Sequence, residues 1–96
     1  MLKDADDGFY KRADAHIFLS NNQLKDAPLG NVSASMMYGL ARFNACVSAS
    51  GFQSGEQMSA AREEAIKYFM GQYRQMLEEH LDDYIANFDK FRELAK

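Results

Sequence analysis

The sequence has no tryptophan and no threonine, and it has a single proline and a single cysteine. A lone cysteine, Cys46, excludes an internal disulfide bond and is typical of proteins from a reducing compartment. We therefore expect a cytoplasmic location. Because threonine is absent and valine and isoleucine are few, the composition also disfavours β-strands.

Long apolar runs and an excess of basic residues are also missing. No uninterrupted apolar stretch reaches the ~18 residues that a membrane-spanning helix needs. The opening segment MLKDADDGF has no apolar region of the kind found in signal peptides, so we expect no signal peptide. The net charge of -3 and the lack of a basic run argue against binding to nucleic acid or to anionic lipid. We therefore expect no nucleic-acid partner and no membrane partner.

What the chain does contain is helix-forming sequence. Its 96 residues are 47% hydrophobic and 26% charged, which is enough for one domain spanning residues 1–96 with one apolar core. Glycines and Pro28 divide it into runs with apolar residues at helical spacing. These runs predict three helices, at about residues 7–26, 33–50 and 55–94.

Three end signals support these boundaries. Ser33 is a suitable N-cap for the second helix. Gly51 can end that helix in the left-handed conformation. Ser54 and Gln57 have the spacing of a capping box, which predicts the start of the third helix.

The third helix is too long for a compact domain. From residue 56 to residue 94 it would extend about 58 Å at ~1.5 Å per residue, whereas a domain of this size is only about 30–35 Å across. Gly71 is its weakest point, at a cost of about 1 kcal/mol relative to alanine. Its second half carries apolar residues in steps of four and three, a pattern typical of helix pairing: Leu77, Leu81, Tyr84, Phe88 and Phe91.

These observations predict an all-α fold. In it, an antiparallel helical hairpin packs on the first half of the long C-terminal helix. The second half of that helix mediates dimerisation with another copy of the chain.

An acidic run, EEHLDD at residues 78–83, is the first candidate for a metal site. Carboxylate-bridged metal sites in helical bundles use Glu-x-x-His on facing helices. A motif that ends at His80 would need a glutamate at position 77, and that residue is leucine. We interpret the run as a solvated helix face and expect neither a metal nor another cofactor.

Arg42 is the most informative charged residue, because it is the only one between residues 28 and 55. A helix so poor in charge should be covered on most sides, and a buried guanidinium needs a carboxylate partner. Asp14 is the first candidate for a structural ion pair with Arg42, and Glu63 is the second. The alternative is a small-ligand or anion-binding pocket that uses Arg42, Arg12, His16 and Asn44.

No arrangement of residues predicts catalysis. A catalytic base needs a nearby nucleophile or an orienting carboxylate, and the sequence around His16 and His80 supplies no such pattern. We therefore predict a non-enzymatic homo-oligomer that acts through protein contacts, with itself or with an unidentified protein partner. A ligand-binding or enzymatic site around Arg42, Arg12 and His16 is the alternative.

Two segments carry a resemblance to a known family. FYKRADAHIFLSNNQ (residues 9–23) and VSASMMYGLARFNA (residues 32–45) resemble a family of short bacterial proteins known only as a domain of unknown function. The resemblance covers about the first half of the chain. It implies a small, cytosolic, helical bacterial protein and adds no activity.

Overall fold

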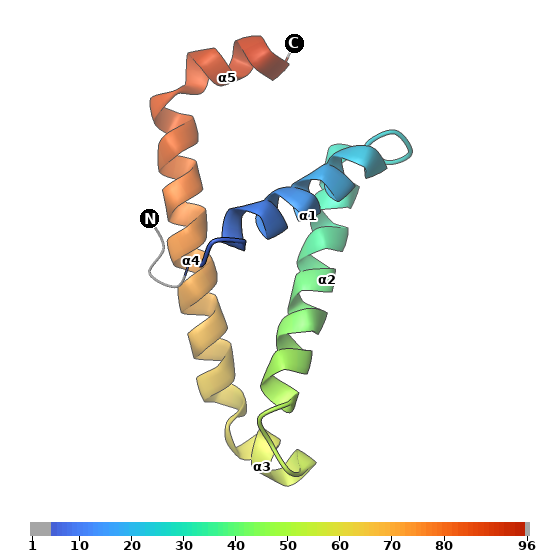
Figure 1. The fold of residues 1–96 in the computed structure, drawn as a ribbon, viewed down its shortest axis with the longest axis vertical. Helices are drawn as coiled ribbons and strands as arrows, with labels where there is room; N and C mark the ends of the chain where they lie inside the picture. The colour runs from blue at the N-terminus through green and yellow to red at the C-terminus, as the bar shows by residue number, and fades with distance from the viewer. Residues whose placement is uncertain (1–4, 96) are drawn as a thin grey trace. The chain divides into compact units, whose positions relative to one another are not determined.

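The computed structural model describes residues 5–95, and their side chains as far as residue 92 (Figure 1). The predicted all-α fold is confirmed over this range. The chain divides into two units, residues 1–45 and 46–96, and each is described by itself. Residues 1–4, on which the signal-peptide prediction partly depends, lie outside the described range. In that range there are five helices and no strand: α1 Phe9–Gln23, α2 Leu29–Ala49, α3 Gly55–Ala60, α4 Arg62–Ala86 and α5 Phe88–Ala95.

Helix α2 begins four residues before the predicted start. The carbonyl oxygen of Pro28 accepts hydrogen bonds from the backbone N–H groups of Asn31, at 3.0 Å, and Val32, at 3.1 Å. Proline suits this position because its fixed φ fits a helix start and its missing N–H leaves no unpaired donor. Ser33 therefore lies inside the helix, and the prediction that it is the N-cap is wrong.

The first turn of α2 holds the one buried side chain among the described residues, Val32, which is 5% exposed. Nearby, the Ser20 hydroxyl lies 3.4 Å from the Met36 sulfur. Ser20 is close to the end of α1 and Met36 is in the first half of α2, so these helices meet near the turn (Figure 1). Antiparallel packing along their whole length stays a prediction.

The end of α2 differs from the expected left-handed cap. None of the described glycines has a positive φ. Instead, the Gly51 N–H bonds to the Ser48 carbonyl and the Phe52 N–H bonds to the Ala49 carbonyl, both at 3.1 Å. These i to i−3 bonds end the helix with a tightened last turn. The predicted left-handed Gly51 is therefore wrong.

The predicted cap at Ser54 is confirmed. The Ser54 hydroxyl accepts the backbone N–H of Gln57 at 3.2 Å, and the Gln57 side chain accepts the backbone N–H of Gln53 at 2.9 Å. In the usual capping box the second bond goes to the N-cap residue itself. Here it goes to the residue before it, and α3 begins directly after Ser54.

The predicted single helix over residues 55–94 is interrupted twice, and neither break is at Gly71. The first break is at Ala61, with φ −99° and ψ 7°, and the second is at Asn87, with φ −116° and ψ 28°. The Asn87 side-chain amide donates to the backbone carbonyl and to the carboxylate of Asp83, each at 3.0 Å. The Asp83 carbonyl also accepts the Asn87 backbone N–H at 3.0 Å, so the side-chain bonds add to the last helical hydrogen bond of α4. Figure 1 shows α5 leaving the axis of α4 at this point.

Candidate functional site

The most extensive feature of residues 46–95 is an apolar stripe along α4. We call it the α4 stripe; its members recur every three or four residues and are each 40–64% exposed: Ile66, Met70, Tyr73, Leu77, Leu81 and Tyr84. Within its own unit, α4 packs with α3 and α5, which adjoin its two ends. Among the described residues of that unit, therefore, no helix runs alongside the stripe and covers it.

Helix α5 extends this apolar surface beyond the break at Asn87. Its Phe88 is 52% exposed and its Phe91 is 42% exposed. The rings of Tyr84 and Phe91 are 4.9 Å apart at 81°, an edge-to-face contact. The predicted interface residues Leu77, Leu81 and Tyr84 thus lie on α4, while Phe88 and Phe91 lie on α5. The ring contact joins the two groups.

The acidic run at residues 78–83 lies mostly on the other side of α4, because its carboxylates fall between the positions of the stripe. The Arg74 guanidinium lies 3.6 Å from the Glu78 carboxylate, one turn away, and both side chains are largely exposed. No group of three or more His, Cys, Asp or Glu residues in the described part of the chain could hold a metal ion. The expected absence of a metal stays a prediction.

Helix α2 has an apolar stripe of its own. Its exposed members share one face: Leu29, Met36, Leu40, Phe43 and Val47. Arg42 comes two residues after Leu40 and so lies on the opposite face, about 160° around the helix. It is exposed, and its guanidinium sits over the ring of Tyr38 at 5.2 Å. The expectation that Arg42 is buried is wrong, and the spacing from Leu40 is the sequence signal that could have shown this.

Despite their apolar stripes, the described helices are not membrane spans. None of them is both long and apolar enough to cross a bilayer.

The structure does not bring the predicted polar site together. Arg12 pairs with Asp6 at 2.7 Å, near the start of α1. Among the described residues, no hydrogen bond or ion pair joins Arg42 to Asp14, Arg12, His16 or Asn44. The second candidate partner, Glu63, pairs with its neighbour Arg62 at 2.6 Å. The ion pair between Arg42 and Asp14 stays a prediction.

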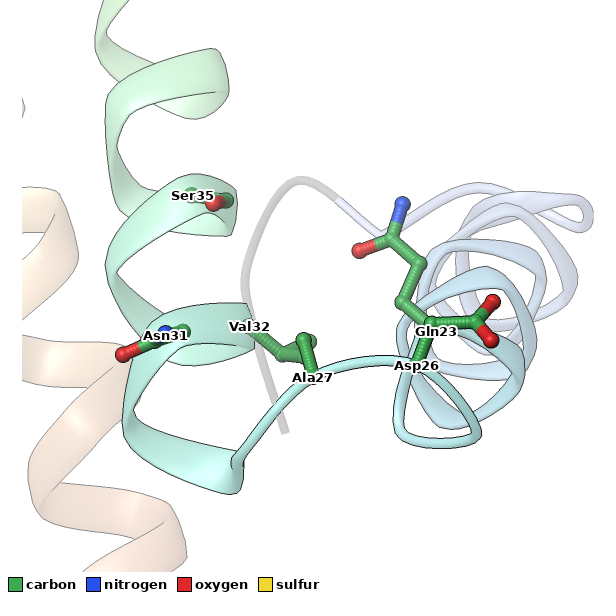
Figure 2. Close-up of a pocket in the computed structure, with 6 residues that line it drawn as sticks. All are labelled: Gln23, Asp26, Ala27, Asn31, Val32 and Ser35. Carbon is green, nitrogen blue, oxygen red and sulfur yellow. The ribbon is translucent and has the colours of Figure 1, made fainter.

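A shallow pocket of about 310 Å³ lies at the turn between α1 and α2 (Figure 2). In Figure 2 the polar ends of Asp26 and Asn31 point away from one another. A small-molecule site needs polar groups that converge on the ligand, and this arrangement does not provide them. The pocket lining is Gln23, Asp26, Ala27, Asn31, Val32 and Ser35.

Comparisons with known proteins agree with the helical fold. A family model described as a protein of unknown function (DUF3144) matches residues 9–85. A solution NMR structure of protein NB7890A from a Shewanella species is similar, with 40% sequence identity and a TM-score of 0.77. That match covers 98% of this chain and 100% of the other. No curated protein matches the sequence.

Proposed function

This chain belongs to the DUF3144 family of proteins of unknown function, and we propose that it is a non-enzymatic homodimer that acts through protein contacts. The observation that carries the proposal is the α4 stripe, which has no covering helix within its own unit. Large contiguous apolar surfaces on soluble proteins mark interaction sites. We place the dimer in the cytoplasm, because an exposed free thiol such as Cys46 suits a reducing compartment.

The length of the α4 stripe fits a second copy of the same helix as the covering partner. From Ile66 to Tyr84 the stripe spans 19 residues, or about 28 Å at ~1.5 Å per residue. The break at Asn87 separates α5 from this run. A second copy of α4 has the same length and the same apolar spacing.

The available area supports the same choice. If each member of the α4 stripe has about 80–100 Å² left to bury, six of them provide about 500–600 Å² per chain. Two chains would bury about 1,000–1,200 Å², which reaches the ~1,000 Å² expected of a specific interface. Phe88 and Phe91 add to this area. A symmetric dimer also uses one surface twice and closes the assembly.

The alternative of an anion-binding or enzymatic site gains no support from the geometry. Arg12 is already paired with Asp6, and Arg42 lies over Tyr38. His16 is exposed, with no carboxylate or nucleophile bonded to it among the described residues. A binding pocket would need these groups to converge.

Sedimentation equilibrium at micromolar concentration tests the proposal. The wild-type chain should have twice the chain mass of 10.9 kDa. Tyr73→Asp should yield a monomer, because it places a charge in the α4 stripe. Tyr68→Asp is the matched control: Tyr68 is 58% exposed and lies on the same helix, about 140° around from Tyr73. This variant should remain a dimer. A wild-type monomer would refute the proposal.

A further inference from the structure

Helix α2 carries three apolar side chains beyond the point where α1 meets it, and we call them the outer α2 face: Leu40, Phe43 and Val47. They are 44%, 68% and 50% exposed. The described contact between α1 and α2 joins Ser20 to Met36, and Figure 1 shows the two helices diverging from their turn. Given the proposed dimer, on which this inference rests, we propose that the outer α2 face packs against the second copy of the chain.

The composition of α2 supports burial of this face. The helix has 21 residues, from Leu29 to Ala49, and Arg42 is its one charged residue. A helix with so little charge is expected to be covered by its neighbours. Arg42 lies over the ring of Tyr38, on the side of α2 away from Leu40. The charge therefore does not interrupt the outer α2 face.

Helix α1 covers only the near part of the α2 stripe. The contact of Ser20 with Met36 shows which sides of the two helices face each other. Ile17 lies about 60° from Ser20 around α1, and it is 52% exposed. Both helices therefore leave apolar side chains open next to the sides by which they meet.

The area of the outer α2 face favours the second copy as its occupant. If each of its three side chains has about 80–100 Å² left to bury, the contact would bury about 500–600 Å² in total. A separate partner protein would need ~1,000 Å² for a specific interface. A second copy that the α4 stripe already holds needs no such area, because the first contact gives the second one a high effective concentration.

A matched pair of α2 variants tests this contact by sedimentation equilibrium. Phe43→Ala should raise the dimer dissociation constant by about 20-fold or more, because a symmetric dimer contains this largely exposed ring twice. Tyr38→Ala is the control, since Tyr38 is also 68% exposed and lies about 140° around the same helix. It should leave the dissociation constant within about twofold of the wild-type value. Equal effects of the two variants would overturn the inference.

Isotope-filtered NOE spectra identify what covers Phe43. Labelled and unlabelled wild-type chains are unfolded, mixed and refolded together, so that mixed dimers form. The Phe43 ring should then show NOEs to protons of the other copy. A dimer in which this ring shows NOEs only within its own chain would overturn the inference and leave the α4 dimer standing. A wild-type monomer by sedimentation would overturn the proposed dimer itself, which separates the two failures.

Discussion

In the proposed dimer, shortening one leucine of the α4 stripe should weaken association, by an amount set by the area that this leucine has left to bury. Leu77 is 40% exposed, so about two fifths of its burial remains to be gained on association. Full burial of a leucine is worth about 1.5–3 kcal/mol, and two fifths of that is about 0.6–1.2 kcal/mol. A symmetric dimer contains Leu77 twice. Leu77→Ala should therefore weaken association by about 1.2–2.4 kcal/mol.

At ~1.4 kcal/mol for each factor of ten, this loss raises the dimer dissociation constant roughly 7- to 50-fold. Alanine is a better helix former than leucine, so the substitution should not weaken the helix itself. Sedimentation equilibrium over a concentration series measures the dissociation constant, and circular dichroism at high concentration checks that helix content is kept.

Tyr68→Ala supplies the control for this prediction. Tyr68 lies nine residues before Leu77, about 180° around α4, and is 58% exposed. The change removes more apolar surface than Leu77→Ala, yet it should leave the dissociation constant unchanged. An unchanged constant for Leu77→Ala, or an equal weakening for Tyr68→Ala, would refute the assignment of the stripe.

Four further outcomes are expected. Arg42→Ala should lower the free energy of unfolding by urea by no more than about 1 kcal/mol, because the described contact of Arg42 is an exposed cation–π pair. A loss of about 3–5 kcal/mol that becomes smaller when Asp14→Ala is added would instead establish the predicted ion pair. Ser54→Ala should lower that free energy by about 0.5–2 kcal/mol through loss of the α3 cap. Asn87→Ala should join α4 and α5 into one helix, seen as added helical amide signals by NMR. Millimolar EDTA should leave the melting temperature unchanged, and a reproducible shift would reveal a metal site.

Much of the fold could be predicted from the sequence, because helix spacing and end signals are local. The predicted cap at Ser54 is confirmed for this reason, because its two hydrogen bonds join residues at most four positions apart. The start of α2 differs from the prediction because Pro28 separates two helical runs and also begins the second of them. Its carbonyl can also accept the first helical hydrogen bonds.

The break at Asn87 was missed for a different reason. It depends on the backbone conformation of one residue, Asn87, whose side chain bonds to Asp83. The apolar spacing continues through this residue and gives no sign of the break. The low helix propensity of glycine makes Gly71 the predicted weak point, but Gly71 lies inside α4 and the helix continues through it.

The predicted interface residues are exposed, and they lie on two helices, α4 and α5, where the spacing predicted one. Their role in an interface stays a prediction. Arg42 is exposed because its direction on the helix is opposite to Leu40, and the low charge of α2 alone does not show this. The spacing of the apolar residues along α2 defines its two faces, so the sequence alone could have shown that Arg42 lies opposite the apolar face.

Val32 is the one buried side chain among the described residues, and this has a consequence for how the protein responds to dilution. In the proposed dimer, a chain with so little burial among its described residues would gain much of its stability from the α4 stripe that it shares with the second copy. Folding and pairing would then be a single equilibrium, and the melting temperature would depend on protein concentration. Dilution alone would act as a denaturant, and the abundance of the chain in the cell would set the fraction that is folded.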